Sequence, residues 1–376
     1  MKLSDIVDRI NGNVDRFTTD LEYYIGGEHM ESNELEITGR GMLKENLGKL
    51  GFKFHFAFQE RDVIFMARNP HLRKAGMVMF AGLCSDASYI LRSKDENVIT
   101  QEFLAVQLQS DHFWDYCERT KVGSVNFANN WTSIANYEFD LPPIKEQKEI
   151  SQKVWAAYRL KGSYKKLLAA TDEMVKSQFI EMFGSHATIP VGNYIEDSYP
   201  GEWGTEDKEG DGVKVIRTTN FTNTGKLDLT DVVTRSIIEK KIERKTIHKY
   251  DTILERSGGT ADNPVGRVVL FEEDDVYLCN NFTQVLRFKN IDPRFAFYSL
   301  FYFYQTNKTA VRAMGSKTTG IQNLNMSKYL EIGIPDATED EQNKFVSIAE
   351  QADKSKFELR KSIDAIDAVI KSLINN

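Results

Sequence analysis

The chain has 376 residues, more than one compact core usually holds, so two or more domains are expected. Its net charge of −7 argues against a protein that binds nucleic acid over its whole surface. No run of about 18 apolar residues could span a bilayer, the N-terminal residues lack an apolar signal core, and the cysteines form no C-x-x-C pair. These features predict a cytoplasmic protein without disulfides.

The first 141 residues combine short β-rich runs with turn signals. Residues 63–66 and 77–80 are predicted as buried strands, and apolar residues recur at helical spacing over residues 101–114. A basic stretch extends from Arg40 to Lys74. This mixture predicts an α/β domain over residues 1–141.

A long heptad-patterned segment follows at residues 142–184. Pro142 and Pro143 mark its start, because proline cannot donate to a sheet but is tolerated in the first turn of a helix. Glu146 and Glu149 suit the positive end of the helix dipole. We predict a helix of roughly 35 residues here, or about 50 Å at 1.5 Å per residue.

The same order of signals returns over residues 185–334. Residues 251–254 correspond to residues 62–65, Cys279 corresponds to Cys84, and residues 294–304 supply a second helix rich in aromatic residues. A second basic stretch extends from Arg235 to Lys249. Residues 185–334 are therefore predicted to form a second α/β domain of the same plan.

Residues 335–376 repeat the long helix. The Glu-Gln pair at 341–342 stands where the pair at 146–147 stands in the first copy, an offset of 195 positions (341 − 146). Under this offset the apolar positions coincide, and Lys161 and Lys356 interrupt them at the same step. The predicted coiled-coil positions are Ile150, Val154, Ala157, Lys161, Tyr164, Leu168 and Val175 in the first copy, and Phe345, Ala349, Ala352, Lys356, Leu359, Ile363, Ile366, Ile370 and Leu373 in the second.

An isolated amphipathic helix of this length is unstable in water, so each copy should pack against the other. Because each helix follows its own domain, the pair is expected to be antiparallel. The predicted fold class is α+β, with two mixed α/β domains in a pseudo-twofold arrangement, separated by two long helices that form an antiparallel coiled coil. The alternative is two unrelated surface helices, each packed on its own domain.

Several stretches resemble a known family. Residues 141–150 are similar to the L-P-P-x-x-E-Q-x-x-I boundary of the specificity (S) subunits of type I restriction–modification systems. Residues 130–137 and 315–324 resemble the ends of that family's recognition domains, and the order of domains and helices matches over the whole chain. The second boundary, residues 334–342, departs from the pattern because it lacks the second proline and is two residues longer.

The resemblance implies a DNA-recognition subunit that performs no chemistry itself. Each target-recognition domain would read one half of a split target in double-stranded DNA. The helices would fix the gap between the halves and dock two methyltransferase (M) subunits. S-adenosylmethionine would be used by the M subunits, and ATP and Mg²⁺ by restriction (R) subunits, so this chain would bind no cofactor. Reading two half-sites from one face requires a separation that matches the DNA repeat of about 34 Å.

Motifs for catalysis are incomplete. Asn69-Pro70-His71-Leu72 is similar to the Asn-Pro-Pro-aromatic loop of amino-methyltransferases, but it lacks the second proline and the aromatic residue. Residues 315–318 lack the glycines of a phosphate loop, and Pro335-Asp336 is not followed by the Glu-x-Lys of a nuclease site. The six histidines do not have the spacing of zinc ligands. We expect no catalytic residues and no metal site.

DNA contacts are expected from basic and polar side chains near turns. Arginine pairs with guanine and asparagine with adenine, each worth about 1–3 kcal/mol of discrimination, whereas lysine contacts to phosphate carry no sequence information. Any one of these side chains could instead be an ordinary solvated residue. The candidates are Arg68, His71, Arg73, Lys74, Arg217, Thr218, Asn220, Lys240, Lys241, Lys245, Arg256, Ser257 and Lys317.

Two functions remain open at this point. The chain is either a type I specificity subunit or an interaction scaffold whose duplicated domains bind protein partners without sequence-specific DNA binding. If the helices act as a ruler, one heptad inserted after Ala157 and another after Ala352 should lengthen the gap in the target and leave the half-sites unchanged.

Overall fold

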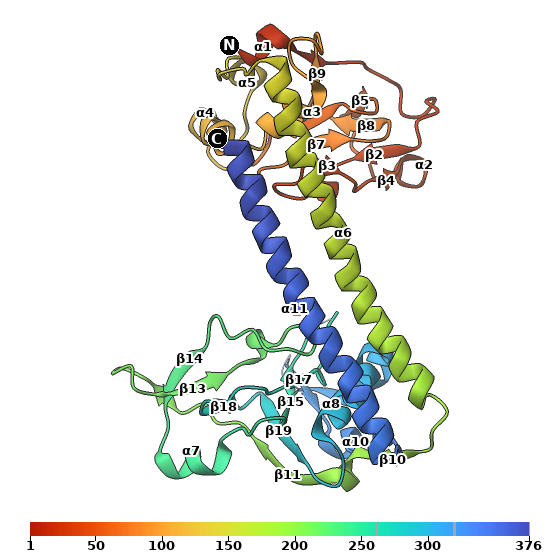
Figure 1. The fold of residues 1–376 in the computed structure, drawn as a ribbon, viewed down its shortest axis with the longest axis vertical. Helices are drawn as coiled ribbons and strands as arrows, with labels where there is room; N and C mark the ends of the chain where they lie inside the picture. The colour runs from red at the N-terminus through yellow and green to blue at the C-terminus, as the bar shows by residue number, and fades with distance from the viewer. Residues whose placement is uncertain (261, 319–320, 376) are drawn as a thin grey trace. The chain divides into compact units, whose positions relative to one another are not determined.

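The computed structural model describes residues 1–260, 262–318 and 321–375. The chain divides into two compact units, Met1–Leu168 with Glu358–Asn376, and Ala169–Phe357. Each unit holds one mixed α/β domain and one end of each of two long helices, α6 (Ile144–Phe183) and α11 (Glu339–Asn375) (Figure 1). The predicted domain boundaries at residues 141, 184 and 334 stay predictions, because the units divide the helices between them.

Two sheets run through the described part of the first unit. The larger has the strand order β1-β9-β6-β7-β3 and the smaller has the order β4-β2-β8-β5. The strands are β1 (Val7–Ile10), β2 (Tyr23–Ile25), β3 (Glu36–Ile37), β4 (Gly41–Met42), β5 (Phe54–Phe58), β6 (Val63–Met66), β7 (Ala75–Val78), β8 (Gly82–Ser85) and β9 (Ser88–Ser93). The shorter helices are α1 (Leu3–Ile6), α2 (Leu43–Asn46), α3 (Gln101–Gln107), α4 (Asp111–Thr120) and α5 (Trp131–Ala135), and the 3-10 turns are η1 (Gly27–His29) and η2 (Pro70–Leu72).

The second unit has two four-stranded sheets and the short pairings β10-β22 and β16-β21-β20. The sheet of order β11-β19-β15-β17 contains more residues and is called the larger, and the sheet of order β12-β14-β13-β18 is called the smaller. The strands are β10 (Thr188–Pro190), β11 (Ile195–Pro200), β12 (Thr205–Glu206), β13 (Val213–Ile216), β14 (Val233–Ser236), β15 (Thr252–Glu255), β16 (Ser257–Gly258), β17 (Val268–Leu270), β18 (Tyr277–Cys279), β19 (Thr283–Phe288), β20 (Gly315–Thr318), β21 (Ile321–Leu324) and β22 (Gly333–Pro335). The helices are α7 (Glu239–Lys245), α8 (Pro293–Thr306), α9 (Lys308–Ala313) and α10 (Met326–Tyr329), with the 3-10 turns η3 (Val191–Tyr194) and η4 (Thr218–Asn220).

The two domains share one topology. The order β1-β9-β6-β7 recurs as β11-β19-β15-β17, and β4-β2-β8 recurs as β14-β13-β18. The pairs β2–β8 and β13–β18 are both parallel, with Ile25 opposite Cys84 in the first and Ile216 opposite Cys279 in the second. The correspondence of Cys84 with Cys279 is therefore confirmed.

A buried ion pair is repeated in the two larger sheets. Asp62 is 1% exposed and accepts from Arg92 Nε at 2.7 Å and Nη2 at 2.8 Å; Asp251, 3% exposed, accepts from Arg287 Nε at 3.0 Å and Nη2 at 2.7 Å. Each aspartate also accepts from the backbone N–H three residues earlier, at 2.8 Å. The predicted match between residues 62–65 and 251–254 therefore extends to side-chain chemistry.

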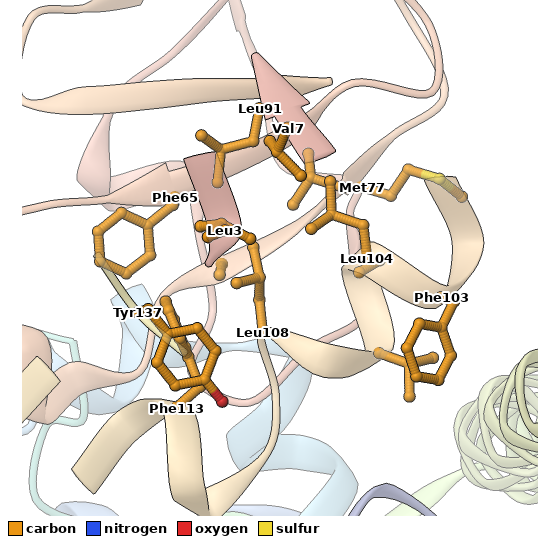
Figure 2. Close-up of a cluster of buried hydrophobic side chains, with 14 of the residues drawn as sticks. Leu3, Val7, Phe65, Met77, Leu91, Phe103, Leu104, Leu108, Phe113 and Tyr137 are labelled. Carbon is orange, nitrogen blue, oxygen red and sulfur yellow. The ribbon is translucent and has the colours of Figure 1, made fainter. Parts of the chain in front are cut away.

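The core of the first domain lies between its larger sheet and the helices α3 to α5. Phe65 and Met77 from the sheet, Leu104 from α3 and Phe113 from α4 belong to one buried cluster (Figure 2). Tyr137 closes this cluster just before α6 and is fully buried. The equivalent cluster of the second domain is formed mainly by α8, whose Phe295, Phe297 and Leu300 are 1% exposed or less.

Two expected elements differ in extent. The predicted strand over residues 77–80 is instead β7, which ends at Val78, and Met79 is 47% exposed. The helical pattern over residues 101–114 belongs to two helices, because α3 ends at Gln107 and α4 begins at Asp111. Ser110 caps α4: its Oγ accepts from the N–H of Phe113 at 3.1 Å. Within the described part of the chain, every helix is too short or too polar to cross a bilayer.

The long helices pack together in the first unit. Val154, Trp155 and Tyr158 of α6 share a hydrophobic cluster with Ile370 and Leu373 of α11. The N-terminal part of α6 thus lies beside the C-terminal part of α11, which makes the pairing antiparallel. The second unit has the complementary arrangement, because Val175, Phe179 and Phe183 near the end of α6 cluster with residues near the start of α11, including Phe345, Ala349 and Ala352.

The repeated lysines each bind an aspartate on the opposite helix. Lys161 Nζ lies 2.6 Å from Asp367 Oδ1 in the first unit, and Lys356 Nζ lies 2.8 Å from Asp172 Oδ1 in the second. Asp172 and Asp367 are 195 positions apart, as Lys161 and Lys356 are. Both pairs of residue numbers have the sum 528, so the two bonds fit the same antiparallel register.

The predicted coiled-coil positions are all at least partly shielded from solvent. Val154, Val175, Phe345, Ala349 and Ala352 are buried. The remaining positions are half-buried: Ile150, Ala157, Lys161, Tyr164, Leu168, Lys356, Leu359, Ile363, Ile366, Ile370 and Leu373. This is the burial expected of the seam of a two-helix pair whose outer faces meet water.

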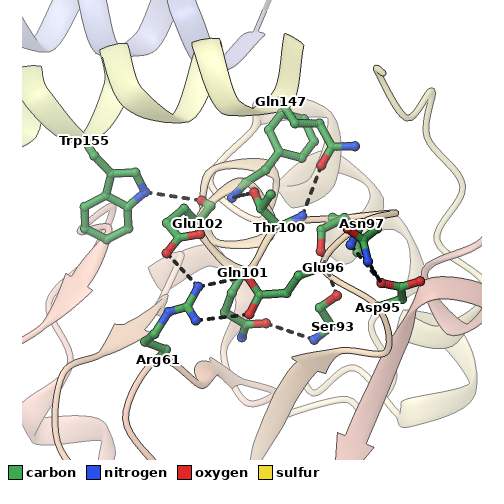
Figure 3. A network of polar contacts seen from close by, with 12 residues as sticks. Arg61, Ser93, Asp95, Glu96, Asn97, Thr100, Gln101, Glu102, Gln147 and Trp155 are labelled. Carbon is green, nitrogen blue, oxygen red and sulfur yellow. Dashed lines mark hydrogen bonds and ion pairs between the residues drawn. The ribbon is translucent and has the colours of Figure 1, made fainter. Parts of the chain in front are cut away.

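The glutamine of each Glu-Gln pair joins its helix to the domain before it. Gln147 is fully buried; its Oε1 accepts from the N–H of Thr100 at 3.2 Å, and its Nε2 donates to the carbonyls of Val98 and Pro142, each at 2.8 Å (Figure 3). Gln342 Oε1 accepts from the N–H of Asp292 at 2.9 Å, and its Nε2 donates to the carbonyl of Ala337 at 2.8 Å. Thr100 and Asp292 are the N-caps of α3 and α8, so the same link is made twice.

Gln147→Leu is expected to destabilise the first unit by about 1–3 kcal/mol, because the buried N–H of Thr100 and two carbonyls lose their partner. Urea unfolding followed by tryptophan fluorescence measures the change. Gln152→Leu, at an exposed position of α6, is the matched control and should shift the free energy of unfolding by no more than about 0.5 kcal/mol. Equal effects of the two substitutions would contradict this role for Gln147.

Candidate nucleic-acid interface

The predicted contact residues of the first domain surround η2. Arg68 and His71 are exposed, and neither side chain forms an ion pair or hydrogen bond with the described residues. Arg73 instead binds Asp111 Oδ1 at 2.7 Å, and Lys74 Nζ donates to the carbonyl of Gly27 at 2.7 Å. Arg68 and His71 are therefore available to a ligand, whereas Arg73 and Lys74 already hold local structure.

Most predicted contact residues around η4 and β16 take part in polar contacts within the domain. Asn220 is 4% exposed; its Oδ1 accepts from the N–H of Arg217, and its Nδ2 donates to the carbonyls of Asp228 and Asp231. Arg217 Nη2 lies 3.0 Å from Asp231 Oδ2, and the carbonyl of Thr218 accepts from Arg267. Contacts between these residues and DNA stay predictions, and any such contact would compete with the bonds formed here.

Arg256 and Ser257 are similarly engaged. Arg256 Nη1 donates to Gln284 Oε1 at 3.3 Å, and the buried Ser257 donates through Oγ to Asn323 Oδ1 at 2.7 Å. Lys317 lies in β20, and its side chain is outside the part of the chain that the structure describes.

Two of the lysines of α7 form ion pairs within the domain, and a third is exposed to solvent. Lys241 and Lys245 each approach a carboxylate oxygen of Glu202 at 3.2 Å. Burial raises the pKa of Glu202, but the two ammonium groups outweigh this effect and the pKa lies below its usual value. Lys240 is exposed and has no partner among the described residues, so it presents its charge to solvent.

The structure brings the two basic stretches to equivalent places. In each domain the stretch begins beside the smaller sheet and continues into the helix that follows its β4 or β14 strand: α2 in the first domain and α7 in the second. Lys44 and Lys49 are exposed in the first, as Lys240 and Arg244 are in the second. Each domain therefore presents cations at the same edge, although the chain as a whole is acidic.

Stacked cations on the smaller sheets were not foreseen from the sequence. The guanidinium of Arg40 lies 4.3 Å from the ring centre of Tyr23 and 4.8 Å from that of Phe80. In the second domain Arg235 lies 4.4 Å from the ring centre of Trp203. Stacking fixes the plane of a guanidinium and can leave its edge donors to bind phosphate or guanine, although Arg235 Nε already donates to the carbonyl of Trp203 at 3.0 Å.

The cysteines of the two smaller sheets, Cys84 in β8 and Cys279 in β18, are buried. Burial raises the pKa of Cys84 to about 12 and of Cys279 to about 11, so both thiols are neutral at physiological pH and are poor nucleophiles. Among the residues that the structure describes, His, Cys, Asp and Glu side chains do not gather into a group that could hold a metal ion. What the surfaces offer is positive charge, planar donors and exposed loops.

Comparison with known proteins identifies a family of DNA specificity domains. A family model described as the type I restriction modification DNA specificity domain matches residues 1–163 and 199–366, one match for each half of the chain. A search of curated protein sequences finds no match.

Two solved structures have a similar fold over the full chain. One is a chain from a study of complex assembly and conformational transition of the type I R-M system, with a TM-score of 0.57 at 16% identity, covering 100% of this chain and 95% of that one. The other is the S subunit of a type I restriction–modification system from M. genitalium, with a TM-score of 0.55 at 13% identity, covering 100% and 94%. At these identities the likeness concerns the fold.

Proposed function

Because this chain belongs to the type I restriction–modification DNA specificity family, we propose that each of its two domains reads one half of a bipartite target in double-stranded DNA. The chain supplies sequence recognition and is not itself the enzyme of such a system. The paired helices α6 and α11 set the number of unread base pairs between the half-sites. This division assigns recognition to the domains and measurement to the helices.

This proposal rests on one observation: the two domains have the same topology, and the two long helices make the same contact with each other twice. Both domains repeat the same strand order, and Lys161–Asp367 and Lys356–Asp172 repeat the same contact between helices. Duplex DNA has an approximate twofold symmetry of its own, and proteins that read two half-sites match it with a twofold arrangement. The two ion pairs, which hold the helices in one register, suit a spacer of fixed length.

We further propose two methyltransferase subunits as partners, which would transfer the methyl group of S-adenosylmethionine to DNA, with restriction subunits that use ATP and Mg²⁺ joining where they are present. Exposed apolar residues on α6 favour docking along the helices. Leu160 is 44% exposed, Leu167 50% and Met174 50%, and they recur every seven residues at positions that flank the seam. Apolar side chains in such a row are typical of a surface that is covered in an assembly.

A binding selection tests the proposal. The chain, alone and co-expressed with the methyltransferase subunit of its system, is incubated with random duplex DNA, and bound sequences are recovered and read. We expect two short conserved half-sites separated by a constant number of unspecified base pairs. Recovery of unselected sequence with the chain alone and with the complex would overturn the proposal and favour the scaffold function instead.

A further inference from the structure

A patch of cations lies at the midpoint of the duplicated helix pattern. Residues that face each other in the antiparallel pair have numbers that sum to 528, and equivalent residues differ by 195. Both conditions are met only between residues 166 and 167 of α6 and between residues 361 and 362 of α11. Lys166 and Lys361 adjoin this midpoint, and Lys165 and Arg360 come next to them. These four residues, which we call the midpoint cations, all belong to the first unit.

The midpoint cations are two equivalent pairs, since Lys165 corresponds to Arg360 and Lys166 to Lys361 at the offset of 195. A twofold axis that exchanges two antiparallel helices must be perpendicular to the plane of the pair. Such an axis turns each face of the pair onto itself, so equivalent residues lie on the same face. Lys165 and Arg360 therefore share a face, and Lys166 and Lys361 flank it on the two helices.

Within each unit, the corresponding position of a long helix contacts that unit's own domain. Lys165 lies 3.2 Å from Glu34 of the first domain, and Tyr158, one heptad earlier on α6, hydrogen-bonds the same carboxylate. Burial and then this carboxylate raise the pKa of Tyr158. Asp353, the equivalent of Tyr158 in α11, lies 2.8 Å from Lys226 of the second domain. Burial lowers the pKa of Lys226, but Asp353 and Glu272 more than restore it, so the ion pair is maintained.

The positive charge of the patch is poorly compensated. The nearby carboxylates of Asp172 and Asp367 form ion pairs with Lys356 and Lys161, so they do not neutralise the midpoint cations. Lys166, Arg360 and Lys361 are exposed and have no acidic partner among the described residues, while Asp364, one turn from Arg360, offsets part of the charge. In the pair between Lys165 and Glu34 the lysine side chain is 50% exposed and the carboxylate 16%, so Lys165 keeps a side open to an anion from solvent.

The patch is accessible to a large ligand. Lys165 and Lys166 line a groove of about 720 Å³ between α6 and residues 28–40 of the first domain. Gly162 forms part of its floor, and a Cβ added there would meet no heavy atom within 4 Å. Arg40, the stacked arginine of the smaller sheet, lines the same groove. Two of the midpoint cations thus line the groove together with Arg40, while the first domain also contributes four carboxylates to it, from Glu28, Glu31, Glu34 and Glu36.

We propose that the midpoint cations bind phosphates of the spacer, the stretch of DNA between the half-sites that neither domain reads. The inference rests on the proposed function, since the midpoint of the helix pair then faces the midpoint of the target. Phosphate contacts supply affinity without sequence information, which is what an unspecified spacer requires. The helix pair is then a DNA-binding element in its own right as well as a ruler.

The test compares the assembled complex with one that carries Lys165→Gln, Lys166→Gln, Arg360→Gln and Lys361→Gln together. The dissociation constant for target DNA is measured as a function of salt concentration. Each phosphate contact contributes about 0.9 to the slope of log K against log salt, so the slope should fall by about 3 to 4. Preference for the two half-sites should stay unchanged.

A matched control carries Lys145→Gln, Lys148→Gln, Lys153→Gln and Lys344→Gln, four exposed lysines nearer the helix starts and without acidic partners among the described residues. It removes the same charge and should leave the slope within about one unit of the parent. Replacing phosphates at the centre of the spacer by neutral methylphosphonates should weaken DNA binding by the parent complex and leave DNA binding by the quadruple variant unchanged.

Equal slopes for the two variants would overturn the proposal. So would loss of the methyltransferase subunits from the quadruple variant without DNA, since the patch would then bind protein. Failure of the proposed function would look different, because the parent complex itself would show no preference for a bipartite sequence.

Discussion

Arg92→Leu is expected to destabilise the first unit by about 3–5 kcal/mol, the cost of leaving a buried charge without its partner. The carboxylate of Asp62 is 1% exposed and would keep one backbone N–H donor from Gln59. Asp62→Ala should cost less, because the guanidinium that it leaves behind is 35% exposed and can be hydrated. The order of the two effects therefore follows from the unequal burial of the partners.

Urea unfolding followed by tryptophan fluorescence measures these changes. Trp114, Trp131 and Trp155 lie in the first unit and Trp203 in the second, so the signal reports mainly on the first. Lys53→Ala, which breaks a pair that is 47% and 35% exposed, is the control and should cost no more than about 1 kcal/mol. The equivalent Arg287→Leu should destabilise the second unit to a similar degree, and a cost below about 1 kcal/mol in both units would contradict the assigned role.

One heptad added at the midpoint of both helices should lengthen the recognised target by about three base pairs. Seven residues add about 10 Å to a helix, and DNA rises about 34 Å in ten base pairs. The insertion points are after Lys166 and after Lys361, with a neutral heptad that is apolar at its two seam positions. Both half-sites should stay unchanged in a binding selection with the variant complex.

The choice of insertion point matters because of the ion pairs. Insertion after Ala157 and Ala352, which the sequence alone suggested, would move Lys161 one heptad from Asp367 and towards Arg360. It would likewise move Lys356 from Asp172 towards Lys165. Insertion at the midpoint leaves both pairs intact.

Two controls accompany the midpoint insertion. Four residues added at the same points break the heptad frame and should abolish recognition of any fixed gap. The insertion after Ala157 and Ala352 should give a weaker and less stable complex. A change in the half-site sequences after the midpoint insertion would show that the helices do more than set the distance.

The helices and the duplication could be predicted because they follow simple periods in the sequence. A shift of the chain by 195 positions superimposes the apolar positions of the two helices, brings Lys161 onto Lys356, and brings Cys84 onto Cys279. The aspartates that bind those lysines carry the same offset, and their role became clear only from the antiparallel register. Local patterns thus gave the elements, while partners across the fold required coordinates.

The candidate nucleic-acid interface was harder to predict because it is assembled from distant segments. Arg40, Tyr23 and Phe80 meet only when the strands of the smaller sheet have been arranged. Asn220 is a favourable residue type for reading adenine, yet its side chain is occupied by backbone groups. The residue type alone does not distinguish a side chain that holds a turn from one that is free to bind DNA.

The ion pairs between the helices have a consequence for how such a chain can change. Each helix carries a lysine and, 11 residues later, an aspartate: Lys161 and Asp172 in α6, Lys356 and Asp367 in α11. Either helix is therefore self-complementary and could form both bonds with a second copy of itself. One half of the chain can be replaced by another half of the same design without loss of the register, so new targets can arise by exchange of whole halves while the gap between the half-sites is inherited unchanged.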